Sequence, residues 1–70
     1  MKKFMKLRGR IVEKYGTQSA FAKKIGRSEV SVVNKLNGKT EFSQKDIIDW
    51  SNALDITKDE VGSFYFAEKL

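Results

Sequence analysis

Apolar residues recur along this chain at intervals of three and four, the spacing that places side chains on one face of an α-helix. The alternation that a half-buried strand needs is rare, and the chain has no proline to interrupt a helix. Glycines and capping residues divide the pattern into five segments. We therefore expect an all-α fold in which five short helices surround one core.

The first segment ends at Gly16, a residue suited to the left-handed conformation just past a helix end. Its spacing predicts one buried face made of Phe4, Leu7, Ile11, Val12 and Tyr15.

Two shorter segments follow, each opened by a hydroxyl residue and closed at a glycine. Thr17 and Ser28 can accept a backbone N–H bond as N-caps, and Gly26 and Gly38 stand where these helices must stop. The residues predicted to face inward are Phe21, Ala22 and Ile25, and then Val32 and Leu36.

Two short helices joined at a glycine form the arrangement of a helix-turn-helix, which we place at about residues 17–37. Ala22 must be small because the two helices cross there at close range, and Gly26 supplies the backbone angle that begins the tight turn. Val32 and Leu36 seat the second helix on the first. Its outer face is then free to enter the major groove of DNA.

Capping-box patterns open the fourth and fifth segments, Ser43 with Asp46 and Thr57 with Glu60. Apolar pairs flank both boxes, as in a hydrophobic staple: Phe42 with Ile47, and Ile56 with Val61. The fourth helix is predicted to bury Ile47, Trp50, Ala53 and Leu54, with Asp49 and Asn52 outward. Residues 63–66 fit a last helical turn or a short strand equally well.

Residues 17–39, TQSAFAKKIGRSEVSVVNKLNGK, resemble the lambda-repressor-like, or Cro and repressor, helix-turn-helix family. The likeness continues through residues 42–61, because that family also has a loop, a fourth helix and a short fifth helix after the Asn-Gly stop. The resemblance implies one lambda-repressor-like DNA-binding domain over residues 1–70. No second domain for ligand sensing or cleavage is expected, which makes a Cro-like phage repressor the nearest type.

The resemblance also implies roles for single residues. Gln18 bonds a phosphate and braces the recognition helix. The positions that face the major groove are Ser28, Glu29, Val30, Val33 and Asn34. The family contacts the DNA backbone from positions that correspond to Asn37, Lys39, Thr40 and Ser43. Thr40 is also in a place to reach a base.

The side chains predicted to face the major groove suit particular bases, and some of them also allow another role. Asn34 can pair with an adenine, and Val30 or Val33 can pack on a thymine methyl group. The same valines also fit the core or a dimer contact. Glu29 can accept a bond from cytosine, or it can only stabilise the start of its helix through the helix dipole.

Basic residues are concentrated at the start of the chain. Residues 1–27 carry nine Lys or Arg against one Glu, a net charge of +8, whereas residues 28–70 carry a net charge of −3. One side of the fold is therefore expected to face a polyanion. Lys2 and Lys3 fit a solvated charge run as well, and Arg8 and Arg10 fit either a phosphate contact or a solvated face.

Helix geometry places three further cations beside the groove, Lys23, Lys24 and Arg27, where they can neutralise phosphates. Lys35 departs from the apolar residue that the resembled family prefers at its position. We expect its stem to lie along the helix pair and its ammonium group to reach a phosphate.

Most aromatic residues fall at core spacing, so base stacking is the weaker interpretation of Phe4, Phe21, Phe42, Trp50, Phe64, Tyr65 and Phe66. Three adjacent aromatics cannot all be buried in one helical turn. At least one residue of Phe64–Phe66 should be exposed in a monomer, and we expect this region to form a homodimer interface.

Several classes of function are disfavoured by composition. The chain has no cysteine or histidine, so we expect no disulfide, metal or cofactor, and it offers too little volume to enclose a drug-sized ligand, so we expect no enzyme. No signal-peptide pattern or apolar run of membrane-spanning length occurs, and a cytoplasmic bacterial protein, nucleoid-associated when bound to DNA, is expected.

The sequence therefore predicts a sequence-specific double-stranded DNA-binding protein. We expect a Cro-like repressor of phage or prophage type that acts as a homodimer by occluding a palindromic operator. The alternative is a protein-interaction module, such as an antitoxin or antirepressor, that uses the same fold.

Overall fold

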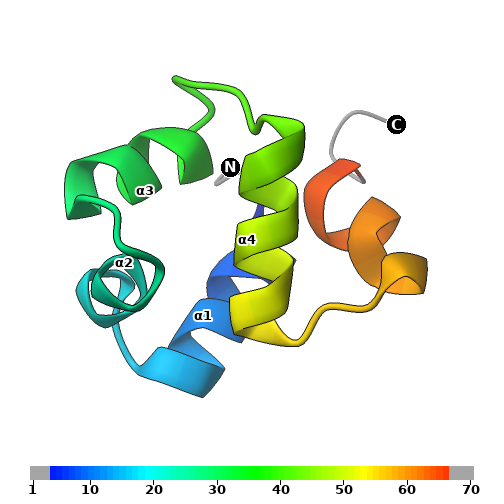
Figure 1. Ribbon diagram of the computed structural model, residues 1–70, viewed down its shortest axis with the longest axis horizontal. Helices are drawn as coiled ribbons and strands as arrows, with labels where there is room; N and C mark the ends of the chain where they lie inside the picture. Colours follow the sequence, from blue (N-terminus) through cyan, green and yellow to red (C-terminus); the bar gives the residue numbers. More distant parts are fainter. Residues whose placement is uncertain (1–3, 67–70) are drawn as a thin grey trace.

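Helices make up the secondary structure of the computed structural model, which describes residues 4–66 (Figure 1). The predicted residues Lys2 and Lys3 lie outside this range. The elements are α1 (Met5–Tyr15), α2 (Gln18–Ile25), α3 (Glu29–Leu36), α4 (Gln44–Leu54), a 3-10 turn η1 (Lys58–Glu60) and a π-helical turn η2 (Gly62–Phe66). No strand occurs over residues 4–66, so the all-α prediction is confirmed, and residues 63–66 are helical.

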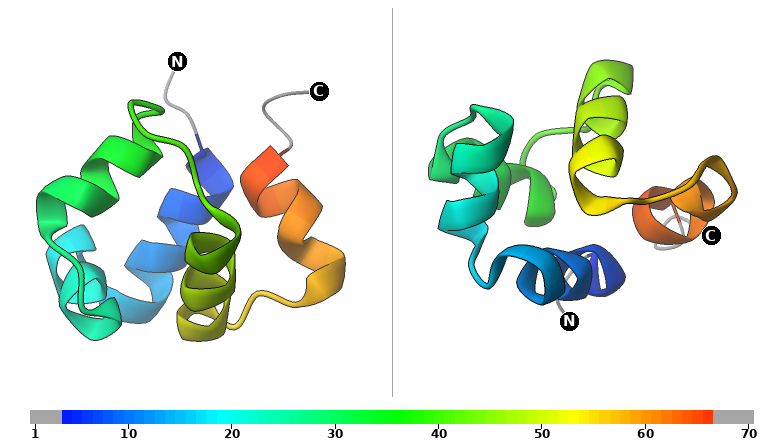
Figure 2. Two further views of the ribbon diagram at one scale, coloured as in Figure 1. Left: turned by 45° about the horizontal axis from the view of Figure 1, so that its top comes forward. Right: turned by 60° about the horizontal axis from the view of Figure 1, so that its bottom comes forward.

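The helices form two groups on either side of α4. The pair α2 and α3 lies on one side of it and the η1–η2 segment lies on the other, while α1 runs beneath them (Figures 1 and 2). Contacts from α1 reach α2, α4 and η2. This central position lets α1 hold both groups together.

The core is made almost entirely of the residues predicted to face inward. The fully buried side chains include Leu7, Ile11, Phe21, Val32, Leu36, Trp50 and Leu54. Val12 is the exception, because 57% of it is exposed. A helix turns by about 100° per residue, which places Val12 about 140° away from Leu7 and off the buried face.

Aromatic rings cross the core in edge-to-face contacts. Phe42 lies at the centre, with ring centroids 5.4 Å from Phe4, 4.9 Å from Trp50 and 5.2 Å from Tyr65. Trp50 also meets Phe21 at 4.9 Å. Each such pair adds about 0.5–1.5 kcal/mol beyond burial alone. The prediction that most aromatics belong to the core is confirmed.

The predicted helix caps form as expected. The hydroxyl groups of Thr17, Ser28 and Ser43 each accept a hydrogen bond from the backbone N–H three residues on, at 3.0–3.1 Å. Asp46 completes the box by accepting from the backbone N–H of Ser43 at 2.9 Å. These caps fix where α2, α3 and α4 begin.

The C-terminal segment folds back onto α1 and α4. Glu60 accepts bonds from the backbone N–H of Thr57 at 3.1 Å and from its hydroxyl at 3.3 Å, which starts the η1 turn. Tyr65 is buried, and its hydroxyl lies 3.1 Å from that of Ser51 on α4. Phe66 stays 41% exposed, as expected for one of three adjacent aromatics.

Two arginines of α1 cap the far ends of other helices. Arg8 donates to the carbonyl of Leu36 and to the side-chain oxygen of Asn37, both at 2.8 Å. Arg10 donates to the carbonyl of Leu54 at 2.7 Å. The last carbonyls of a helix have no partner within it, so these bonds satisfy the C-terminal ends of α3 and α4 and tie both to α1.

A buried carboxylate joins α3 to α4. Asp46 is buried, and it accepts bonds from the Lys35 ammonium at 2.9 Å and from the Ser43 backbone. Lys35 also donates to the carbonyl of Glu41 at 3.1 Å. In this structure the Lys35 ammonium is therefore turned inward and paired, contrary to the expectation that it reaches a phosphate.

Burial by itself would raise the pKa of Asp46, because it disfavours the charged form. The Lys35 ammonium and the hydrogen bonds from Ser43 outweigh that effect and lower the pKa to about 2, from an ordinary value of 3.8. The carboxylate is therefore charged throughout the physiological range.

Because its folded-state pKa is depressed, Asp46 contributes stability that is fully present above about pH 4 and is lost as the pH falls towards 2. The contribution is about 2 kcal/mol. We expect Asp46→Asn to lower the free energy of unfolding at pH 7 by about 3 kcal/mol, because the largely buried Lys35 ammonium loses its only charged partner among residues 4–66. Urea unfolding from pH 7 to pH 2 measures both effects.

Asp49→Asn is the matched control, since Asp49 is more exposed and should contribute less than about 0.5 kcal/mol. An Asp46→Asn variant with wild-type stability and an unchanged acid slope would show that the buried pair contributes nothing.

Candidate nucleic-acid interface

The turn between α2 and α3 has the geometry predicted for a helix-turn-helix. Gly26 adopts φ 72°, in the left-handed region that favours glycine. The backbone N–H of Arg27 donates to the carbonyl of Ala22 at 2.9 Å, which closes the end of α2. Ala22 is buried where α2 and α3 pack together, and Val32 and Leu36 seat α3 from beneath.

The outer face of α3 carries the side chains predicted to read bases. Glu29 is exposed, and Val30 is 68% exposed, which excludes it from the core of this domain. Val33 and Asn34 are half-buried one turn further along. The face is therefore apolar and weakly acidic rather than basic.

The loop after α3 folds against the end of that helix. The carbonyl of Asn34 accepts bonds from the backbone N–H groups of Lys39 at 2.9 Å and Thr40 at 3.4 Å. The side chains of Lys39 and Thr40 are exposed, so both are accessible for the contacts to the DNA backbone that the resemblance implies. Asn37 and Ser43 are exposed too, but Asn37 already accepts from Arg8, and Ser43 caps α4.

The remaining predicted contacts lie on α2 and at its end. Gln18 is the first residue of α2 and is half-buried, while Lys23 and Lys24 are exposed in the last turn. Arg27 is 37% exposed and lies beside two acids of α4, Asp46 at 3.6 Å and Asp49 at 3.7 Å. Arg27 is therefore less available to a phosphate than its place in the sequence suggests.

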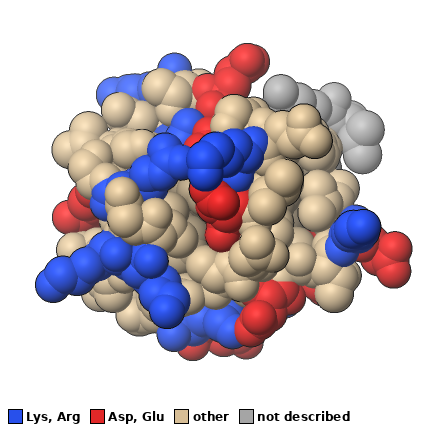
Figure 3. Space-filling model, viewed as in Figure 1, with Lys and Arg blue, Asp and Glu red and all other residues tan. Residues whose placement is uncertain are grey.

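Many cations of the basic first third have protein partners. Lys14 pairs with Asp55, and Lys6 donates to the hydroxyl of Ser63 at 3.0 Å. With Arg8 and Arg10 on helix ends, much of this charge stabilises the fold. Figure 3 shows the consequence on one face, where positive and negative side chains are interleaved.

The long-range roles of Arg8, Arg10 and Asp46 were not predicted from the sequence. One signal was available for the buried pair. Lys35 stands where the resembled family prefers an apolar residue, and a lysine there needs an acidic partner from elsewhere in the chain. Asp46 lies four residues before Trp50, on the inward side of α4, and was the candidate.

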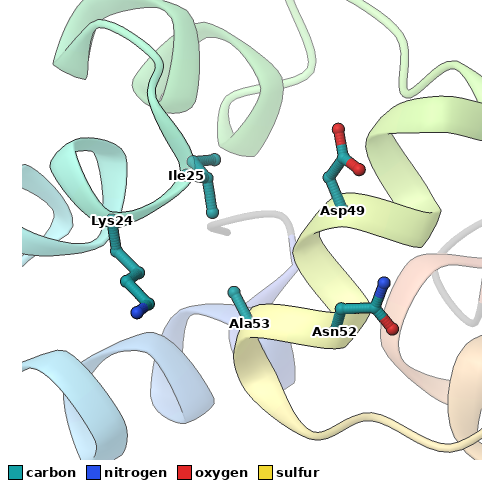
Figure 4. Close-up of a pocket in the computed structure, with 5 residues that line it drawn as sticks. All are labelled: Lys24, Ile25, Asp49, Asn52 and Ala53. Atoms are coloured by element: carbon teal, nitrogen blue, oxygen red, sulfur yellow. The ribbon is translucent and has the colours of Figure 1, made fainter.

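A surface groove of about 420 Å³ separates α2 from α4, lined by Lys24, Ile25, Asp49, Asn52 and Ala53 (Figure 4). The groove is open to solvent, so it is not shaped to enclose a ligand. Its volume is nevertheless larger than we expected from the sequence, which predicted no space for a drug-sized ligand. Within residues 4–66, no cluster of acidic side chains is placed to hold a metal ion. Over the same range, none of the helices has both the length and the apolar character needed to cross a bilayer.

The chain matches the model of one protein family and a solved structure. Residues 2–68 match the family described as protein of unknown function (DUF739). The solution structure of the modulator of repression of the temperate bacteriophage TP901-1 from Lactococcus lactis is 32% identical, with a TM-score of 0.84. The match covers 93% of this chain and 88% of that one. No curated protein matches.

Arg8→Ala should lower the stability of the fold and not merely remove a surface charge. The variant leaves the end of α3 without two donors, so we expect the free energy of unfolding to fall by about 1–3 kcal/mol. Lys24→Ala removes the same charge from an exposed site and should change it by less than about 0.5 kcal/mol. Thermal unfolding followed by circular dichroism compares them, and equal stabilities would contradict the capping role.

Proposed function

The chain belongs to the DUF739 family, and from this premise we propose that it is a phage-type transcription regulator that binds double-stranded DNA sequence-specifically. The chief support is the exposed outer face of α3, held at a fixed angle on a well-packed scaffold. The similarity to a phage modulator of repression supports a regulatory role in the same kind of genetic switch.

A reading helix must be rigid, because direct readout depends on side chains that reach base edges in a fixed register. The Ser28 cap fixes the start of α3, Val32 and Leu36 bury its inner face, and Arg8 holds its end. These contacts come from three directions. They leave the outer face free.

Four residues of that face carry the proposed specificity. Asn34 pairs with an adenine, and Val30 and Val33 pack on thymine methyl groups. Glu29, at the start of α3, accepts from a cytosine amino group or only stabilises the helix dipole.

The proposed phosphate contacts surround this face. Positive charge comes from Lys24, Arg27 and Lys39, with Lys23 beside them. Neutral donors fix the register on the backbone and are Gln18, Ser28, Asn37, Thr40 and Ser43. Because several cations of the chain are paired internally, we expect a moderate salt dependence.

The biological form that we propose is a homodimer on a palindromic operator, with recognition helices about 34 Å apart. It would act without cofactor or catalysis, as a single domain in the bacterial cytoplasm, and would repress by occlusion in the manner of a Cro protein. The lambda-repressor-like pattern of the sequence supports this form.

Selection of bound sequences from a random DNA pool tests the proposal. Glu29→Ala, Val33→Ala and Asn34→Ala should each change which bases are selected, at a cost of about 1–3 kcal/mol for the preferred site. Lys24→Ala should weaken all sites alike and lower the salt slope by about one. Unchanged base preference in all three α3 variants would refute the groove assignment.

The second candidate is a protein-interaction module such as an antirepressor or antitoxin. One observation favours it: the outer face of α3 is apolar and acidic, and two nearby cations, Arg27 and Lys35, are paired with acids of α4. A gel shift separates the candidates. Absence of nanomolar binding to any genomic fragment, with a protein partner that co-purifies, would favour this module.

Dimerisation through the Phe64–Phe66 region is a further part of the proposal. Phe64 and Tyr65 are buried within the monomer, so Phe66 would carry the contact. We expect Phe66→Ser to weaken the dimer at least ten-fold in sedimentation equilibrium. Val12→Ser removes another exposed apolar side chain, on α1, and should leave it unchanged. A wild-type chain that stays monomeric with and without DNA would exclude this interface.

A further inference from the structure

Arg27 lies between the recognition helix and two acids of α4. Its Nη2 atom is 3.6 Å from Oδ1 of Asp46 and 3.7 Å from Oδ2 of Asp49. Both distances exceed those of a good N–H···O hydrogen bond, so charge attraction alone holds the guanidinium there. A phosphate can offer shorter, charge-assisted bonds to the same group.

The two acids are not equivalent. Asp46 is buried and already accepts close bonds from Lys35 and Ser43, so it is part of the fold. The side chain of Asp49 is 35% exposed, and besides Arg27 it contacts only the exposed Lys45, at 3.1 Å, among the ion pairs of residues 4–66. Asp49 is therefore the acid whose removal changes the hold on Arg27 without disturbing the core.

Direction matters as well as distance. In Figure 4 the carboxylate of Asp49 and the side chain of Lys24 point in opposite directions across the groove. Asp49 therefore acts on Arg27, at the turn, rather than on the last lysine of α2.

We propose that Asp49 is a specificity-determining residue, which competes with DNA phosphates for Arg27 and so suppresses binding to unrelated sequences. This inference rests on the proposed DNA-binding function. Phosphate contacts carry no sequence information, and each one strengthens binding to any duplex. A phosphate held in register by base contacts displaces Asp49, whereas a loosely placed phosphate does not.

The test compares Asp49→Asn with the wild type on the selected operator and on a random duplex of equal length. We expect the variant to bind the random duplex about three- to ten-fold more tightly at about 50 mM salt, with a smaller gain on the operator. One extra phosphate contact adds about 0.9 to the salt slope, so the gain should shrink about three-fold by about 200 mM.

Two controls isolate the interaction. Asp59→Asn removes the same charge from η1 and should change binding to the random duplex less than two-fold. In an Arg27→Gln background, Asp49→Asn should have no effect beyond that of Asp59→Asn. Circular dichroism confirms that each variant is folded.

Equal gains from Asp49→Asn and Asp59→Asn, or an unchanged ratio of operator to random binding, would overturn this inference alone. A wild-type chain without affinity for any DNA would overturn the proposed function and this inference with it.

Discussion

The ion pair between the buried carboxylate of Asp46 and the ammonium of Lys35 is the interaction on which the arrangement of the helices depends. The carboxylate receives the ammonium of Lys35 from α3 and the backbone N–H of Ser43 at the start of α4, and the guanidinium of Arg27 approaches from the turn. Removing a charge from water is costly unless the charge is paired and hydrogen-bonded. The pair therefore favours a position of α3 and α4 in which the Lys35 ammonium reaches the Asp46 carboxylate, and this helps to set the direction in which the outer face of α3 points.

The helix α1 also holds α3 in place, through the C-terminal end of α3. Arg8 satisfies the carbonyl end of α3, and Arg10 does the same for α4, so one helix holds the ends of two others. Lys14 pairs with Asp55 where the chain leaves α4 in a left-handed conformation. Of the seven Lys and Arg residues that the structure describes in the basic first third, five therefore bind other parts of the protein. Net charge overstates the positive surface that the folded domain offers.

This use of charge bears on recognition. A surface rich in free cations binds any nucleic acid, because counterion release does not depend on sequence. Here the outer face of α3 is apolar and weakly acidic, and positive and negative side chains are interleaved on the face of the molecule that Figure 3 shows. Such a surface gains affinity only where its shape and few polar groups match a partner. These properties fit the selective recognition that we propose for this chain.

The sequence by itself determined what depends on neighbours within one or two turns. The hydroxyl caps, the glycine at the α2–α3 turn and the apolar spacing are local, so all four α-helices and most of the core could be predicted. The sequence could also identify α3 as the candidate reading helix. It could not decide residues 63–66, because their conformation depends on how the chain packs, whereas the exposure of Val12 follows from its angle on α1 and could have been predicted.

Only the tertiary structure decided which charges are free. Arg8 meets Leu36 across 28 positions of sequence, and Arg10 meets Leu54 across 44. Lys35 and Asp46 lie on different helices whose mutual angle no local pattern specifies. Coulomb attraction and hydrogen bonding depend on distance in space, and for residues far apart in the chain that distance exists only after folding. The availability of Arg27 is therefore a property of the fold and not of the sequence around it.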